Sequence, residues 1–128
     1  MDVTDVKSMT LGELTAELAL LGEPAFRAGQ VYRWLHRGVS SFEDMTNLSK
    51  SLRKTLAARY YIAVAETERK YCSKLDETVK YLFRLRDGER IESVRMRYRY
   101  GLTVCISTQA GCRMNCSFCA TGKSGFSR

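Results

Sequence analysis

The chain is poor in proline and histidine and has no long apolar run. It contains one proline and one histidine in 128 residues, so it has no Pro-rich linker, and we interpret His36 as a surface or packing residue. No stretch approaches the ~18 apolar residues of a transmembrane helix. The first residues, MDVTDVKS, lack the basic segment and apolar stretch of a secretory signal. We therefore expect a cytoplasmic globular protein.

Five cysteines stand out against this background, at positions 72, 105, 112, 116 and 119. An odd number cannot pair fully within one chain. Thiols stay reduced in the cytoplasm, so a disulfide framework is not expected. Clustered cysteines in a reducing compartment point first to metal or redox chemistry.

The net charge of +7 is unevenly distributed. Residues 1–48 carry 4 basic and 7 acidic side chains, whereas residues 49–128 carry 17 basic and 7 acidic ones. A basic segment favours a polyanionic partner such as nucleic acid. A well-solvated basic surface would have the same composition, so charge alone does not decide between the two.

Helical periodicity dominates the first third of the chain. Thr10 and Glu13 have the spacing of a capping box, and leucines then recur every three or four residues up to Gly22. Pro24 fits the first turn of a second helix, which Gly38 ends. Leucines at 48, 52 and 56 predict a third helix running to about Tyr60. We expect a small helical domain over residues 1–61.

The period then changes to that of strands. Residues 79–85 alternate apolar and basic side chains, and Asp87-Gly88 predicts a hairpin turn before a return strand from about Arg90 to Tyr100. Residues 61–72 predict another strand, and residues 104–107 a short one that leads into the last cysteines. The fold class is therefore α+β, with a β-rich connector over residues 62–97 and a further domain starting within 98–128.

The return strand has two contrasting faces. Arg95, Arg97 and Arg99 alternate on one face, which suits an RNA backbone or a merely solvated strand face. Glu92 shares the other face with apolar residues. Partial desolvation there would raise the pKa of its carboxyl group and suit it to proton transfer, although an ordinary edge glutamate is the alternative.

Three cysteines, Cys112, Cys116 and Cys119, form a C-x3-C-x2-C cluster in a loop rich in small residues. Structural zinc sites usually use four ligands, so a zinc site would need Cys105 or Cys72 as the fourth. A [4Fe-4S] cluster held by three thiolates keeps one iron open for a substrate or cofactor. Glycines at 111, 122 and 125 would let the loop wrap closely around such a cluster.

The cysteine spacing resembles that of the radical S-adenosylmethionine (radical SAM) superfamily, and its surroundings resemble the RlmN/Cfr family of RNA methyltransferases. The similar segments follow one another along the whole chain: GEPAFRAGQ (22–30), FEDMTNLSK (42–50), YLFRL (81–85), IESV (91–94) and CISTQAGCRMNCSFCATG (105–122).

This resemblance implies that Cys112, Cys116 and Cys119 bind a [4Fe-4S] cluster whose open iron binds S-adenosylmethionine. It implies that Glu92 is the proton acceptor and that Cys105 forms a disulfide with a C-terminal cysteine absent from this chain. The implied reaction is methylation of adenine carbon 2 in 23S ribosomal RNA and in tRNA through a methyl-cysteine. An electron donor such as flavodoxin and a monomeric state are also implied, and Cys72 matches no family role.

The family also has a further barrel domain, so the resemblance implies that residues 98–128 are the start of a truncated partial (β/α) barrel. We expect this N-terminal fragment to be inactive alone. Two alternatives stay open. One is the Cfr-type branch, which methylates adenine carbon 8, and the other is a non-catalytic RNA-binding module whose cysteines hold zinc.

Overall fold

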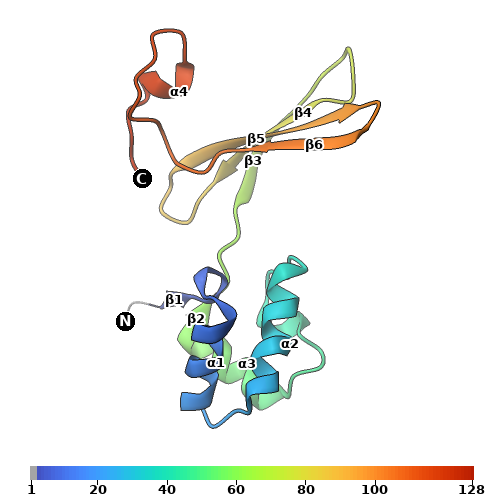
Figure 1. The fold of residues 1–128 in the computed structure, drawn as a ribbon, viewed down its shortest axis with the longest axis vertical. Coiled ribbons are helices and arrows are strands. Elements are labelled where there is room, and N and C mark those ends of the chain that lie inside the picture. The colour runs from blue at the N-terminus through green and yellow to red at the C-terminus, as the bar shows by residue number, and fades with distance from the viewer. Residues whose placement is uncertain (1–2) are drawn as a thin grey trace. The chain divides into compact units, whose positions relative to one another are not determined.

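The computed structural model of the protein describes residues 3–128 and divides into two compact units, Met1–Ala63 and Val64–Arg128 (Figure 1). The first unit is mainly helical, and the second is built on an antiparallel sheet. Within the described residues, no helix has the length and apolar character needed to cross a membrane. The mixed helix-and-sheet class is confirmed, whereas the separate start of a barrel domain within 98–128 stays a prediction.

The helical unit contains three main helices, as the leucine spacing predicts. Its elements are β1 (Thr4–Asp5), the 3-10 turn η1 (Val6–Ser8), α1 (Leu11–Leu20), α2 (Ala25–His36), the 3-10 turn η2 (Phe42–Asp44), α3 (Lys50–Arg59) and β2 (Tyr60–Tyr61). Strands β1 and β2 pair in parallel. The two segments are distant in the sequence, so this pair joins the start of the unit to its end.

The core of the helical unit comes from the predicted apolar positions. Thr10 and Glu13 form the expected capping box, in which the Thr10 amide donates to the Glu13 carboxylate at 2.7 Å. The buried side chains come from all three helices and from the segments before, between and after them: Val6, Leu14, Leu18, Ala28, Val31, Leu35, Phe42, Met45, Leu48, Leu52, Leu56 and Tyr60. Burial of this apolar surface is the main stabilising contribution to the unit.

The second unit is a four-stranded antiparallel sheet with the strand order β3-β4-β5-β6. Its elements are β3 (Glu66–Cys72), β4 (Val79–Arg84), β5 (Arg90–Tyr98), β6 (Gly101–Ile106) and the short helix α4 (Ala120–Lys123). The predicted turn at Asp87-Gly88 joins β4 and β5, and Gly88 has the positive φ of 88° that such turns favour.

The structure differs from the predicted strands at three places. The return strand ends at Tyr98 rather than Tyr100, because the chain reverses there and Gly101, with φ of 137°, begins β6. The predicted strand over 61–72 is split into β2 and β3, which belong to different units. The short strand predicted over 104–107 spans Gly101–Ile106 instead and is an edge strand of this sheet.

Candidate active site and cluster loop

Glu92 and Cys105 lie on the same face of the sheet. Cys105 on β6 is directly opposite Val94 on β5, and directly opposite residues share a face. Glu92 is two residues from Val94, so it lies on that face too. The backbone continues the pairing, because the amide and hydroxyl of Ser107 both donate to the Glu92 carbonyl, at 3.2 and 2.7 Å. The two predicted catalytic side chains are thus diagonal neighbours.

The carboxylate of Glu92 differs from the desolvated group expected from the sequence. Its side chain is 51% exposed, and its Oε1 lies 3.2 Å from Nζ of Lys80. The apolar neighbours on β5 do not cover it, because Lys80 reaches across from β4 and the face is open to solvent. The ammonium of Lys80 instead holds the carboxylate in place on this open face. The carboxylate of Glu92 is therefore solvated rather than buried among apolar side chains.

Lys80 is a site residue that the sequence analysis did not single out. The signal was present, because the Asp87-Gly88 turn fixes the register of β4 and β5. That register places Leu82 opposite Glu92 and Lys80 opposite Val94, which makes Lys80 and Glu92 diagonal neighbours on one face.

A cleft connects Glu92 with the cysteine loop. It has a volume of about 250 Å³. Its lining comes from two parts of the chain. One part is the start of β5 and the segment just after β6 (Arg90, Ile91, Glu92, Ser107 and Gln109), and the other is the loop (Gly111, Ala120, Thr121 and Ser124). The proton acceptor expected from the resemblance and the residues that flank the three loop cysteines therefore border one cavity, although no cysteine is among its lining residues.

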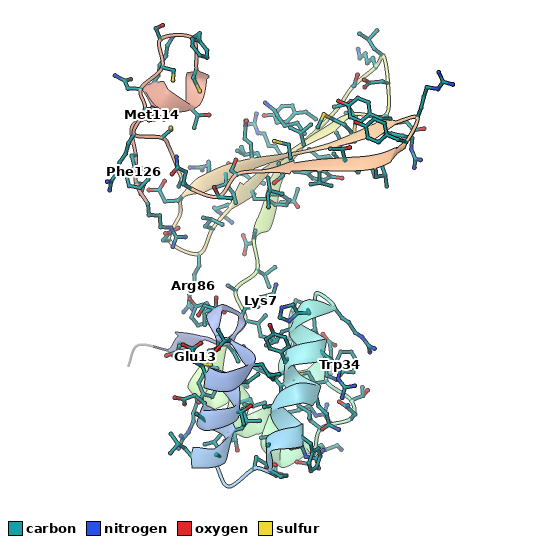
Figure 2. All side chains as sticks on the ribbon, in the orientation of Figure 1. Lys7, Glu13, Trp34, Arg86, Met114 and Phe126 are labelled. Carbon is teal, nitrogen blue, oxygen red and sulfur yellow. The ribbon has the colours of Figure 1, made fainter. Side chains whose placement is uncertain are left out.

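The cysteine loop is closed at its base. Gly111 pairs with Phe126 across an antiparallel bridge, and the Cys112 amide donates to the Gly125 carbonyl at 3.0 Å. Only glycine fits at position 111, because its φ is 78° and an added Cβ would lie 1.9 Å from the Gly125 oxygen. Figure 2 shows Met114 and Phe126 on this segment. The guanidinium of Arg113 lies 4.2 Å from the centre of the Phe126 ring. The loop is thus a defined element rather than a free tail.

The three thiols of the loop are half-buried, whereas those of Cys72 and Cys105 are exposed. A turn links two of the three cysteines, since the Cys119 amide donates to the Cys116 carbonyl at 3.1 Å. Hydrogen bonds from the backbone of Gly122 and then of Thr121 lower the pKa of the Cys119 thiol. This favours the thiolate, which is the form that binds metal.

The donor set fits an iron–sulfur cluster by its chemistry rather than by preassembled geometry. Over residues 3–128, no three potential metal donors lie close enough together to hold an ion. Ligand sets of small metal-binding elements commonly assemble only as the metal binds. Three thiols within one closed loop, one of them with a lowered pKa, suit that behaviour.

Cys72 does not share the face of Cys105. It is opposite Val79 on β4, and Val79 is opposite Arg95, which neighbours Val94 on β5. Neighbouring residues of a strand point to opposite faces, so Cys72 and Cys105 lie on opposite sides of the sheet. The two candidates for a fourth zinc ligand therefore do not converge.

Only two of the three arginines predicted to share one face of the return strand do so. Arg95 and Arg97 share the face opposite to Glu92, where they pair with Val104 and Leu102. Arg99 lies in the β5–β6 turn instead, and Arg97 is ion-paired with Glu77. Tyr98 and Tyr100 stack beside this turn with ring centres 5.2 Å apart. The structure thus leaves the RNA-binding role of these arginines as a prediction.

Comparison with known proteins finds relatives that match both units of the chain. Residues 4–62 match the family described as "Ribosomal RNA large subunit methyltransferase N-terminal domain". The chain is 53% identical, over 97% of its length, to the probable dual-specificity RNA methyltransferase RlmN of Lachnoclostridium phytofermentans, of which it covers 35%. It is 48% identical, over 96% of its length, to the protein of the same name from Bacillus subtilis, of which it covers 34%.

A solved structure is similar as well. The crystal structure of a radical SAM methyltransferase from Sphaerobacter thermophilus matches 98% of this chain with a TM-score of 0.87 and 40% sequence identity, and the match covers 37% of that chain. This chain therefore spans about a third of the length of the relatives it matches.

Proposed function

The chain belongs to the RlmN family of RNA methyltransferases, and from this premise we propose that it provides the RNA-contacting helical unit and the cluster-binding loop of a radical SAM enzyme. The proposed reaction is methylation of adenine carbon 2 in 23S ribosomal RNA and in tRNA. The observation that carries the proposal is a cleft bordered by Glu92 and by Gly111 and Ala120, which flank the three loop cysteines on either side, with Cys105 on the face of Glu92. Nucleophilic methyl transfer would need none of this arrangement.

Cys112, Cys116 and Cys119 would hold the [4Fe-4S] cluster, and S-adenosylmethionine would bind beside it. When bound, these groups supply one-electron reductive chemistry. Adenine carbon 2 needs it, because this electron-poor carbon has no lone pair with which to attack a methyl donor. A low-potential electron donor such as flavodoxin would serve as reductant, and we propose a cytoplasmic monomer.

Glu92 would accept the proton that leaves adenine carbon 2. Its carboxylate borders the cleft, and the ammonium of Lys80, 3.2 Å from Oε1, limits the rotation of the carboxylate. Cys105 would then release the methylated base: its thiolate would attack the sulfur of a second cysteine, outside residues 1–128, that is bonded through the methyl carbon to the base. The disulfide forms as that sulfur–carbon bond breaks, and the bonding electron pair leaves with the carbon, which is then protonated to the methyl group. The exposed thiol on β6 is accessible for that exchange. Since the second cysteine is not in residues 1–128, we propose that these residues alone do not turn over.

The proposal is tested with a chimera that joins residues 1–128 to the remaining two thirds of the Lachnoclostridium phytofermentans relative. After anaerobic reconstitution, it is supplied with 23S ribosomal RNA, tRNA, reductant and S-adenosylmethionine, and the methylated position is mapped by mass spectrometry. Methyl groups on adenine carbon 2 support the proposal. Methyl groups on carbon 8 would assign the Cfr-type activity instead, and no methylation by a chimera that carries an intact cluster would contradict both.

A further inference from the structure

A second cleft lies within the helical unit, beside the C-terminal half of α2. It has a volume of about 170 Å³ and is lined by Gln30, Arg33, Trp34, Arg37 and Asn47. Figure 2 labels Trp34 on this helix. Residues three and four apart share a helix face, so Gln30, Arg33, Trp34 and Arg37 form one strip, and Asn47 faces it from the segment before α3. None of these residues belongs to the site described above.

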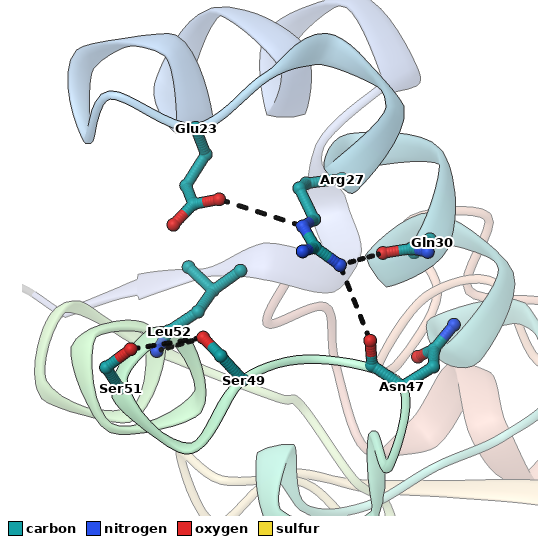
Figure 3. Close-up of polar contacts among 7 residues, drawn as sticks. All are labelled: Glu23, Arg27, Gln30, Asn47, Ser49, Ser51 and Leu52. Carbon is teal, nitrogen blue, oxygen red and sulfur yellow. Dashed lines mark hydrogen bonds and ion pairs between the residues drawn. The ribbon is translucent and has the colours of Figure 1, made fainter.

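The two amide side chains of the cleft have their oxygens engaged. The Arg27 guanidinium donates to Oε1 of Gln30 at 2.9 Å (Figure 3). The indole N–H of Trp34 donates to Oδ1 of Asn47 at 2.6 Å. The NH2 groups of both amides remain as donors. The acidic neighbour Glu23 is directed to Arg27, at 3.8 Å, and does not line the cleft.

The two arginines of the cleft carry charges without an acidic partner. Arg33 is positioned by a hydrogen bond from its Nε to the Gly29 carbonyl at 3.1 Å, and the Arg37 guanidinium lies 5.9 Å from the centre of the Trp34 ring. Among residues 3–128, neither forms an ion pair. The side chains of Gln30, Arg33, Arg37 and Asn47 can therefore donate hydrogen bonds into the cleft, and the two arginines are cationic.

A simpler explanation is the helix dipole. Cations near the end of a helix stabilise it by about 0.3–1 kcal/mol each, and Arg33 and Arg37 lie at the end of α2. The dipole explains positive charge at this end of the helix. It does not explain why two amides direct their oxygens to other donors or why no carboxylate lines the cleft. It is also notable that residues 1–48 as a whole carry more acidic than basic side chains.

We propose that this cleft binds a phosphodiester group of the RNA substrate and so anchors the helical unit to the RNA backbone. Phosphate oxygens only accept hydrogen bonds, which matches a lining that offers N–H donors from four side chains and no carboxylate, and arginine binds phosphate in a bidentate manner. Such a contact positions RNA without reading its sequence. The inference rests on the proposed function, because RNA is the ligand, and it adds the residues of the helical unit that hold it.

The test compares two doubly substituted chains with equal net charge. Arg33→Gln with Arg37→Gln removes both cations of the cleft, and Lys50→Gln with Lys54→Gln removes two exposed lysines of α3 outside it. The affinity of the 128-residue chain for a tRNA transcript is measured at several salt concentrations. We expect the arginine variant to bind at least tenfold more weakly. Its slope of log affinity against log salt should also be smaller by roughly 0.7–0.9, because one phosphate contact is lost.

The lysine variant should keep the wild-type slope. A third variant, Asn47→Asp, adds an acceptor to the cleft and should weaken binding too, while circular dichroism confirms that all variants fold. Equal weakening by the arginine and lysine pairs would show that net charge alone matters and would overturn the inference. Wild-type binding by the arginine variant would overturn it while leaving RNA binding by the chain intact. If the wild-type chain does not bind RNA, both this inference and the proposed RNA contact of the helical unit are wrong.

Discussion

Glu92 and Cys105 are diagonal neighbours on one face of the β-sheet, on strands β5 and β6, with Cys105 opposite Val94. They lie thirteen positions apart in the sequence, and the turn at Arg99 and Tyr100 brings them together. In the proposed reaction, the carboxylate that accepts a proton and the thiol that releases the product must both reach the same part of the substrate. A two-stranded hairpin with a fixed register holds the two side chains close together on one face.

Substitution of Glu92 tests its role as proton acceptor. In the chimera, Glu92→Gln should lower the methylation rate by about 10²–10⁴-fold, because a positioned general base typically contributes that much. The matched control is Glu66→Gln, which removes another exposed carboxylate from the same face of the sheet, where Glu66 pairs with Arg84 at 2.6 Å. If the methylation rate fell equally in the two variants, Glu92 would matter only as one of several negative charges on the sheet and not as a proton acceptor.

Substitution of Gly111 tests the closed base of the cysteine loop. In Gly111→Ala the new Cβ would lie 1.9 Å from the Gly125 oxygen, so the bridge to Phe126 must open and reconstituted iron content should fall sharply. Gly125→Ala is the control, because Gly125 also has a positive φ, 77°, but has free space around it. That change should cost only the backbone strain of about 1–2 kcal/mol. If both variants bind iron alike, loop closure does not matter for the site.

Tyr60 gives the helical unit an alkaline stability limit. Burial, and then its hydrogen bond to Glu17 at 2.6 Å, raises the pKa of Tyr60 to about 12 from an ordinary value near 10. Because the folded pKa lies above the unfolded one, this stabilisation is complete below pH ~10 and is lost as pH rises toward ~12. Tyr60→Phe should remove this steep decline in unfolding free energy between pH 10 and 12. Urea unfolding across that range measures it, and an unchanged decline would contradict the assignment.

The sequence predicts the helical unit well because its signals are local. The capping box at Thr10 and Glu13 and the leucine periodicity specify α1 without tertiary information. The hairpin of β4 and β5 was predictable for the same reason, since Asp87-Gly88 fixes both turn and register. The C-terminal boundary of β5 was not, because the reversal after Tyr98 has no strong turn dipeptide, only Gly101 after it.

The site was harder to predict than the fold. The resemblance supplied Glu92, Cys105 and the three loop cysteines, but the environment of Glu92 depends on a neighbouring strand. Periodicity along β5 puts Glu92 with apolar residues and suggests burial, whereas cross-strand pairing adds Lys80 and leaves the face open. The cleft on α2 was not predictable from the sequence. Its donor-rich lining depends on hydrogen bonds to the amide oxygens of Gln30 and Asn47, which composition does not reveal.

The most direct test of the central claim is the iron and sulfide content of the chain after anaerobic reconstitution, measured for the wild type and for each cysteine substituted by alanine. The account predicts about four iron and four sulfide per wild-type chain. It predicts loss of both in Cys112→Ala, Cys116→Ala and Cys119→Ala, and wild-type content in Cys72→Ala and Cys105→Ala. One zinc per chain without sulfide, or a requirement for Cys72 or Cys105, would contradict it.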